Sequence, residues 1–275
     1  MGSGLHRVNT VPCGKCVACR SNKREEWASR LAMEYYTTFK KGFETFFITL
    51  TFNDENLQNP SLDKRDIQLF NKKFRHYLSY KYFFCGEYGD KFDRKHYHAL
   101  IFCNTVVTPE YFTRSLEKCW PYGFVKADNF TYARARYVAK YALKDDNWSD
   151  TNLSPPFALM STKPAICYDY VKLFHNQIYD GQSLFYCDSV GYHRLPRYVK
   201  EKIFSKIWLR EQNDAYSRLE FNKELYVLRN LQLLHGGNHN AVNSAYRAYM
   251  YQKYKSPEVN YFSNKYIYSR FKNNF

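Results

Sequence analysis

The chain has 275 residues and a formal net charge of +15, from 41 lysines and arginines against 26 aspartates and glutamates. This excess of positive charge favours a partner that carries phosphate groups, such as a nucleic acid. No signal peptide is visible, and no apolar run reaches the roughly 18 to 20 residues that a membrane-spanning helix needs, so a membrane partner is not expected.

Aromatic residues make up 19% of the chain, with 27 tyrosines, 22 phenylalanines and 4 tryptophans. This content exceeds what the core of a chain of this size needs, and exposed rings can stack on unpaired bases for about 1–3 kcal/mol each. The alternative is that the rings fill cores and protein interfaces. Charge and aromatic content together favour single-stranded DNA as the partner.

The first segment, residues 1–45, is rich in cysteine and is expected to contain a basic amphipathic helix at 23–34. Without a secretory signal the eight cysteines are expected to be reduced. The spacing of Cys13, Cys16 and Cys19 is typical of a thiolate metal site, and structural zinc takes four ligands. An iron–sulfur cluster and metal-free thiols are the alternatives. The candidates for the fourth ligand are His6, Cys85, Cys103 and another cysteine.

Residues 46–145 predict a small α+β domain, a central antiparallel sheet with helices packed on one face. Asp63 is the expected N-cap of one helix, and Thr108 with Pro109 at the first position begins another. We expect the metal-binding face of the hairpin described next to be open for DNA. The expected elements are a strand at 46–52, a helix at 63–79, a hairpin at 82–103, a helix at 108–120, a strand at 123–127 and a helix at 131–145.

Two histidines in the expected hairpin form a candidate metal site. Alternation along a strand turns His96 and His98 to one face, where they can share an ion. Glu87 lies on the preceding strand, and one antiparallel register across the turn at 89–94 places its carboxylate on the same face. This mixed nitrogen and oxygen ligand set suits Mg²⁺, Mn²⁺ or a similar ion. The alternative is a pair of surface histidines near the end of a hairpin.

The octapeptide at 137–144 contains two Tyr-x-x-Lys units in tandem. At about 100° per residue, the four side chains Tyr137, Lys140, Tyr141 and Lys144 share one helix face. A phenolate can attack a phosphodiester and leave a covalent phosphotyrosine that conserves the bond for rejoining. A nearby ammonium group can lower the pKa of the phenol and stabilise charge at phosphorus. The alternative is a half-buried aromatic face with snorkelling lysines.

Residues 146–275 predict a C-terminal extension that is mainly helical and contacts DNA. The acidic run at 145–150 and the prolines at 155–156 indicate a loop, and residues 197–235 have apolar positions among charges that are typical of helices. The tyrosines and basic residues from 246 to 275 predict either a clamp on single-stranded DNA or packed structure. The sequence has no G-x₄-G-K-[ST] loop, so unwinding is expected to need a host helicase.

These motifs resemble the HUH endonuclease superfamily of rolling-circle replication initiators, in which a strand with His-hydrophobic-His precedes a helix with one or two tyrosines. The strand at 46–52 looks like the family's first motif, and residues 86–89 are similar to initiators of small single-stranded DNA phages. Tyr97 is a bulky middle residue for the motif, although its side chain is expected to point away from the metal. The nearest group is the microvirus, gokushovirus-type, replication initiation protein. Residues 12–20, 160–164 and 195–198 also look like that group, so the resemblance covers most of 12–200.

The resemblance implies that His96 and His98 are metal ligands with Glu87 as the third, and that Tyr137 and Tyr141 are paired nucleophiles. It implies an HUH palm-like sheet and a metal-dependent, site-specific nickase and strand transferase. This enzyme would start rolling-circle replication, with host helicase and polymerase, in the cytoplasm of a bacterial cell. A plasmid initiator or a transposase would use the same chemistry. From another class, the alternative is a non-catalytic zinc-containing single-stranded DNA-binding protein.

Overall fold

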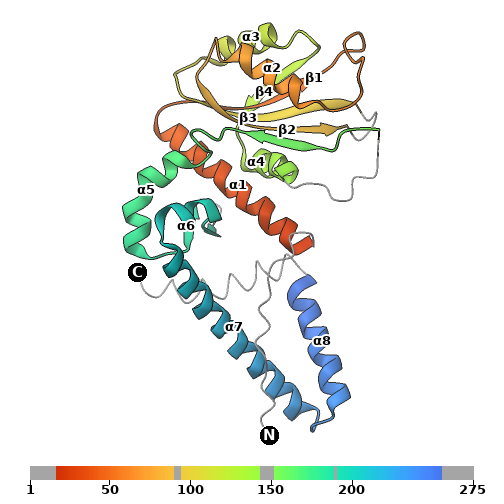
Figure 1. The fold of residues 1–275 in the computed structure, drawn as a ribbon, viewed down its shortest axis with the longest axis vertical. Helices are drawn as coiled ribbons and strands as arrows, with labels where there is room; N and C mark the ends of the chain where they lie inside the picture. Colours follow the sequence, from red (N-terminus) through yellow and green to blue (C-terminus); the bar gives the residue numbers. More distant parts are fainter. Residues whose placement is uncertain (1–16, 90–93, 143–151, 189–190, 256–275) are drawn as a thin grey trace. The chain divides into compact units, whose positions relative to one another are not determined.

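The computed structural model describes the chain except for residues 1–16, 90–93, 143–151, 189–190 and 256–275 (Figure 1). The chain forms two compact units, one of residues 24–211 and one of residues 1–23 with 212–275. The sequence predicted three segments, divided after residues 45 and 145 on the basis of motifs. That division stays a prediction. In the described part of the chain, no helix combines the length and the apolar character needed to cross a membrane.

An antiparallel sheet of five strands forms the centre of the unit 24–211, in the order β4-β1-β3-β2-β5. Every neighbouring pair in this sheet is antiparallel, which confirms the predicted α+β class with a central antiparallel sheet. Strands β2 and β3 are the predicted hairpin, and β3 is the central strand of the sheet. The strands are β1 (Thr45–Thr51), β2 (Tyr80–Tyr88), β3 (Lys95–Cys103), β4 (Val125–Asn129) and β5 (Phe157–Met160).

Helices α2 (Lys64–Phe74) and α3 (Pro109–Cys119) pack on one face of the sheet. The predicted caps are confirmed, because the Asp63 side chain accepts from the Arg65 N–H and the Thr108 side chain accepts from the Tyr111 N–H. Their buried residues join the strands in one aromatic-rich cluster. Its largest fully buried side chains are Phe70, Phe74, Phe84, Tyr97, Phe112 and Trp120.

The opposite face of the sheet is also covered by helices, so the prediction of helices on one face only is wrong. The sheet has apolar residues on both sides, with Phe84 and Ile101 facing one way and Phe83 and Leu100 the other, all fully buried. Both surfaces must therefore be covered. Figure 1 shows α1 and α4 on the side away from α2 and α3. The covering helices are α1 (Val17–Lys40, from residue 24 on), α4 (Tyr132–Ala139), α5 (Tyr168–Gly181) and α6 (Arg197–Ile203).

A buried charge network fixes two of these helices to the sheet. The Lys81 Nζ of β2 lies 2.6 Å from Glu34 Oε1 of α1 and 3.0 Å from Asp169 Oδ2 of α5. The backbone N–H of Cys167 donates to the other Glu34 oxygen at 2.6 Å. Because each buried charge has an opposite partner, the network fixes one arrangement of α1, α5 and β2.

Several predicted element boundaries differ from the structure. Helix α2 ends at Phe74 rather than 79, because the backbone turns there to start β2 at Tyr80; the strand predicted at 123–127 is β4 at 125–129. The helix predicted at 131–145 is α-helical only to Ala139 and continues as a 3-10 turn, η1 (Lys140–Ala142). Strand β5 and helix α5 were not predicted.

The helices predicted over 197–235 are confirmed as α6 and the long α7 (Lys206–Leu234). A short hairpin, β6 (Phe185–Asp188) and β7 (Gly191–Arg194), precedes them. After α7 the chain turns at Gly236 and Gly237, both with positive φ, into α8 (His239–Lys255). The start of the predicted tyrosine-rich tail thus belongs to α8, and the rest lies outside the described residues.

Candidate active site

The β2–β3 register brings the three predicted metal ligands together. Glu87 pairs directly with His96, and His98 lies two residues further along the same face. The Glu87 Oε1 is 2.8 Å from His96 Nε2 and 3.1 Å from His98 Nε2. One ligand atom from each residue lies within 4.8 Å of the others. These residues, called the triad below, form a group that could hold a metal ion, and their side of the sheet is called the triad face.

The outer nitrogens of both imidazoles have partners that fix the rings. The His98 Nδ1 lies 2.8 Å from the Thr49 hydroxyl of β1, and the His96 Nδ1 lies 3.1 Å from the carbonyl oxygen of Arg94. A carbonyl oxygen only accepts, so the contact with Arg94 requires a proton on the His96 Nδ1. With a second proton on Nε2 the ring also donates to Glu87, and a bound cation would take the place of that second proton. Such outer contacts orient metal-binding imidazoles.

The charges of the triad fit a bound cation. Burial opposes ionisation of Glu87, but hydrogen bonds from both histidines and both tyrosines outweigh it and hold the carboxyl pKa well below its usual range. The carboxylate therefore faces two imidazole Nε2 atoms at close range. The second carboxylate oxygen, Glu87 Oε2, is buried without a hydrogen-bond partner. A divalent ion between these groups would satisfy both the carboxylate and the ring nitrogens.

Helix α4 places the first tyrosine against the triad. The Thr131 side chain caps the helix, and the small and apolar residues Ala135, Val138 and Ala139 are buried against the sheet. Tyr137, on the flank of this buried stripe, donates its hydroxyl hydrogen to Glu87 Oε1. Its ring lies edge-on to His98, with the centroids 5.5 Å apart.

The second tyrosine lies beside the first. The Tyr141 ring is 5.9 Å from the Tyr137 ring and is partly buried, whereas Tyr137 is 42% exposed. The structure therefore brings Tyr137, Tyr141 and the triad into one site. Lys144 lies outside the described residues.

The prediction that a nearby lysine lowers the pKa of the tyrosines is wrong for Lys140, whereas the predicted stabilisation of charge at phosphorus stays a prediction. Burial and the neighbouring Glu87 carboxylate raise the pKa of both Tyr137 and Tyr141 well above the usual range. Lys140 is exposed, and its Nζ lies 5.2 Å from the centre of the Tyr141 ring, over its face. A carboxylate in hydrogen-bond contact with the phenol outweighs an ammonium group in solvent.

The predicted zinc site is only partly within the described residues. His6, Cys13 and Cys16 lie outside them, and Cys19 is in the first turn of α1 and partly exposed. Cys85 and Cys103, two candidates for the fourth ligand, are fully buried in the sheet. Burial raises the pKa of the Cys85 thiol well above its usual value and that of Cys103 to about 12. Both thiols therefore resist forming the thiolate that zinc binds. The zinc hypothesis stays a prediction.

Thr49 was not predicted as a site residue. Thr49 contacts His98 because the two residues pair across β1 and β3. This pairing joins strands that are far apart in the sequence. The contact of the Arg94 carbonyl with His96 is local instead, since the two residues are two positions apart in the chain. Only the position of a threonine on the strand could have indicated the Thr49 contact.

Comparison with known proteins gives consistent matches. A family model described as Replication-associated protein ORF2/G2P matches residues 45–146, which contain the triad and both tyrosines. Replication-associated protein VP4 of Bdellovibrio phage phiMH2K is 30% identical over 242 residues, covering 78% of this chain and 74% of that protein. Replication-associated protein ORF2 of Spiroplasma virus 4 is 28% identical, covering 78% and 72%.

A third relative matches a shorter region. Replication-associated protein ORF4 of Chlamydia phage 1 is 29% identical over 166 residues, or 51% of this chain and 41% of that protein. The chain has no significant match among solved structures. The match to VP4 extends over most of both proteins. The chain therefore belongs to the ORF2/G2P family of phage replication-associated proteins.

Proposed function

We propose that this protein starts rolling-circle replication of a small phage genome by nicking and rejoining single-stranded DNA at the origin. The observation that carries the proposal is the Tyr137 hydroxyl, which donates to Glu87 Oε1 inside the Glu87, His96 and His98 group. A nucleophile and a candidate metal site thus share one carboxylate. Relatives named replication-associated proteins of phages support the biological setting.

The chemistry divides between the ion and the chain. A divalent ion held by the triad would polarise the scissile phosphate and steady the leaving oxygen. Glu87 accepts from the Tyr137 hydroxyl beside the ligand atoms, and this contact would position the phenol oxygen for attack on phosphorus. As the bond from the tyrosine oxygen to phosphorus forms, the bond from phosphorus to the 3′ oxygen breaks. The phenol proton passes to water, and the leaving 3′ oxygen takes up a proton from water.

The product is a 5′-phosphotyrosine and a free 3′ hydroxyl that primes synthesis. Rejoining is the reverse displacement, in which a 3′ hydroxyl attacks the phosphotyrosine and the tyrosine oxygen recovers a proton. Tyr141, with its ring 5.9 Å from that of Tyr137, would attack the regenerated junction while the first tyrosine is still occupied. The two residues would alternate in successive rounds, with host helicase and polymerase acting between them.

The test is nicking of a pool of end-labelled single-stranded oligonucleotides with Mn²⁺ and with a chelator. We expect cleavage at one sequence with the metal and none with the chelator, while binding survives chelation and weakens with salt. Unchanged binding with no cleavage at any candidate origin would instead favour the non-catalytic DNA-binding protein. Cleavage that persists in the chelator would exclude the triad as the metal centre of the reaction.

A further inference from the structure

Helix α4 crosses the triad face obliquely. Near its start, the Arg134 guanidinium lies 5.2 Å from the centre of the Phe47 ring of β1 and binds Asp128 of β4 at 3.1 Å. Further along, Tyr137 binds Glu87 of β2. The helix therefore runs from the β4 side of the sheet to the β2 side, and η1 continues over β2 and β5.

This path leaves uncovered the corner of the face where β1 and β4 lie beside the triad. Thr51 pairs with His96, and its backbone N–H donates to the Phe124 carbonyl at 2.9 Å. Thr49, which contacts His98, pairs with Lys126 on its other side. Across the strands, Phe124 therefore lies in line with Thr51 and His96. Lys126 lies in line with Thr49 and His98.

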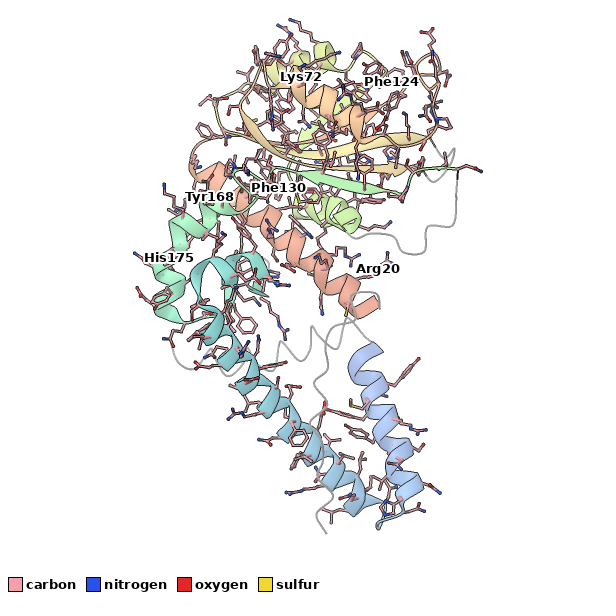
Figure 2. The ribbon with its side chains drawn as sticks, viewed as in Figure 1. Arg20, Lys72, Phe124, Phe130, Tyr168 and His175 are labelled. Atoms are coloured by element: carbon pink, nitrogen blue, oxygen red, sulfur yellow. The ribbon has the colours of Figure 1, made fainter. Side chains whose placement is uncertain are left out.

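The side chains at this corner project into solvent. Val125 and Ala127 pack against the α2–α3 cluster, so strand alternation turns Phe124 and Lys126 to the triad face. The Phe124 side chain, labelled in Figure 2, is 70% exposed, and the Lys126 side chain is 71% exposed. A single exposed ring is ordinary on a protein surface. An exposed ring and an ammonium group in register with a metal-binding group form a more specific arrangement.

The corner keeps a positive charge. The Lys126 Nζ lies 3.3 Å from Asp128 Oδ2, and Arg134 binds the same oxygen at 3.1 Å. Two cations therefore share one carboxylate, which leaves a net positive charge for an anionic ligand. The formal charge of +15 for the whole chain favours a polyanion as that ligand.

We propose that Thr51, Phe124 and Lys126 form a single-stranded DNA subsite beside the scissile phosphate, in which Phe124 stacks on a base and Lys126 contacts a backbone phosphate. The inference rests on the proposed function and adds the residues that hold the strand. Phe124 and His96 are two strand spacings apart, or roughly 10 Å. Stacked nucleotides rise by about 3.4 Å each, so the stacked base lies within about three nucleotides of the cleaved bond.

The test is binding of an end-labelled oligothymidine, followed by fluorescence anisotropy across a salt series. The background is the Tyr137→Phe/Tyr141→Phe double variant, in which cleavage cannot disturb the equilibrium. We expect Phe124→Ala to weaken binding about fivefold or more, as loss of one base stack should, and Phe124→Tyr to bind as the background does. Lys126→Ala should reduce the slope of log affinity against log salt by about 0.7, the value for one phosphate contact on a single strand.

Matched controls lie on α3, which packs on the opposite face of the sheet. Tyr111 is 49% exposed and Lys118 is exposed, so Tyr111→Ala and Lys118→Ala remove a ring and a charge away from the triad. If Phe124→Ala and Lys126→Ala bind like these controls, the subsite is wrong, whatever the wild-type protein does to DNA. If both variants lose binding while the wild-type protein never cleaves DNA, the subsite stands and the nicking function fails.

Discussion

The two faces of the central sheet differ in kind, although they are built from the same strands. On β3, Tyr97 is fully buried against α2 and α3, while its neighbours His96 and His98 are partly exposed on the triad face. The Tyr97 hydroxyl donates to Asp66 Oδ2 at 2.7 Å, so even this polar group is satisfied inside the core. The histidines instead face a carboxylate with an unsatisfied oxygen. Neighbouring residues of one strand therefore belong to the buried core on one face and to the candidate metal site on the other.

The largest effect is expected from removing a ligand on the triad face. His96→Ala should reduce nicking at least about 100-fold, because a metal contributes several kcal/mol and each 1.36 kcal/mol is tenfold in rate. The protein should stay folded with a loss of about 1–3 kcal/mol of unfolding free energy, because the His96 side chain is only 17% exposed and contacts the buried Glu87 carboxylate. Nicking rates and denaturant unfolding measure the two quantities. His76→Ala, at an exposed histidine after α2, is the control. Equal losses in both variants would contradict a special role for His96.

In the α2–α3 core, a substitution is expected to reduce stability and leave metal binding unchanged. Phe112 is fully buried, and its ring centroid lies 3.9 Å from that of Phe46. Phe112→Ala should reduce the free energy of unfolding by about 3–5 kcal/mol through the lost contacts and the cavity. The Mn²⁺ affinity of the folded protein should not change. Chemical denaturation and calorimetric titration test the pair of results, and a parallel loss of metal affinity would show that the two faces are not independent.

Thr49 sharpens the comparison because it acts on the triad through His98. Thr49→Val keeps the shape but removes the hydroxyl that lies 2.8 Å from His98 Nδ1. We expect Mn²⁺ affinity to fall about 10–100-fold, as for other residues that orient a metal ligand. Titration calorimetry measures it, with Thr51→Val as the control, since the Thr51 hydroxyl donates to the Phe124 carbonyl instead. Wild-type affinity in Thr49→Val would remove this positioning role.

The smallest effect is expected at Tyr97, which lies on β3 between His96 and His98 and faces the α2–α3 core. Tyr97→Phe removes the hydroxyl bound to Asp66 and should cost about 1–2 kcal/mol of unfolding free energy. Metal affinity and nicking should stay at the wild-type level, because the side chain points away from the triad. Tyr111→Phe, at an exposed ring, should cost nothing measurable. A drop in Mn²⁺ affinity in Tyr97→Phe alone would mean that the core face also tunes the metal site.

The sequence predicted the triad because its geometry is local. Glu87, His96 and His98 lie on two strands joined by one turn, so alternation and a single register are enough to place them together. The coverage of both faces was also readable in principle, since the uninterrupted apolar run at 82–85 is typical of a strand buried on two sides. Strand β5 is only four residues long and gave no such pattern.

The electrostatics of the tyrosines could not be read from helix periodicity. Spacing placed Lys140 near Tyr137 and Tyr141, but the dominant neighbour of both phenols is Glu87, which comes from another element. The contact of Thr49 with His98 depends likewise on the pairing of β1 with β3. Long-range neighbours of this kind decide the pKa of a side chain and the orientation of a ligand, and a local pattern does not contain them.

The most direct test of the account is a covalent adduct between the protein and DNA. The protein is mixed with end-labelled single-stranded oligonucleotides and Mn²⁺, and the label is followed on a denaturing gel. We predict an adduct with the wild-type protein, a reduced but detectable adduct with Tyr137→Phe or Tyr141→Phe, and none with the double variant, with Tyr111→Phe as a control that keeps the wild-type level. A full adduct in the double variant, or none in the wild-type protein with any candidate origin that it binds, would contradict tyrosine-mediated nicking.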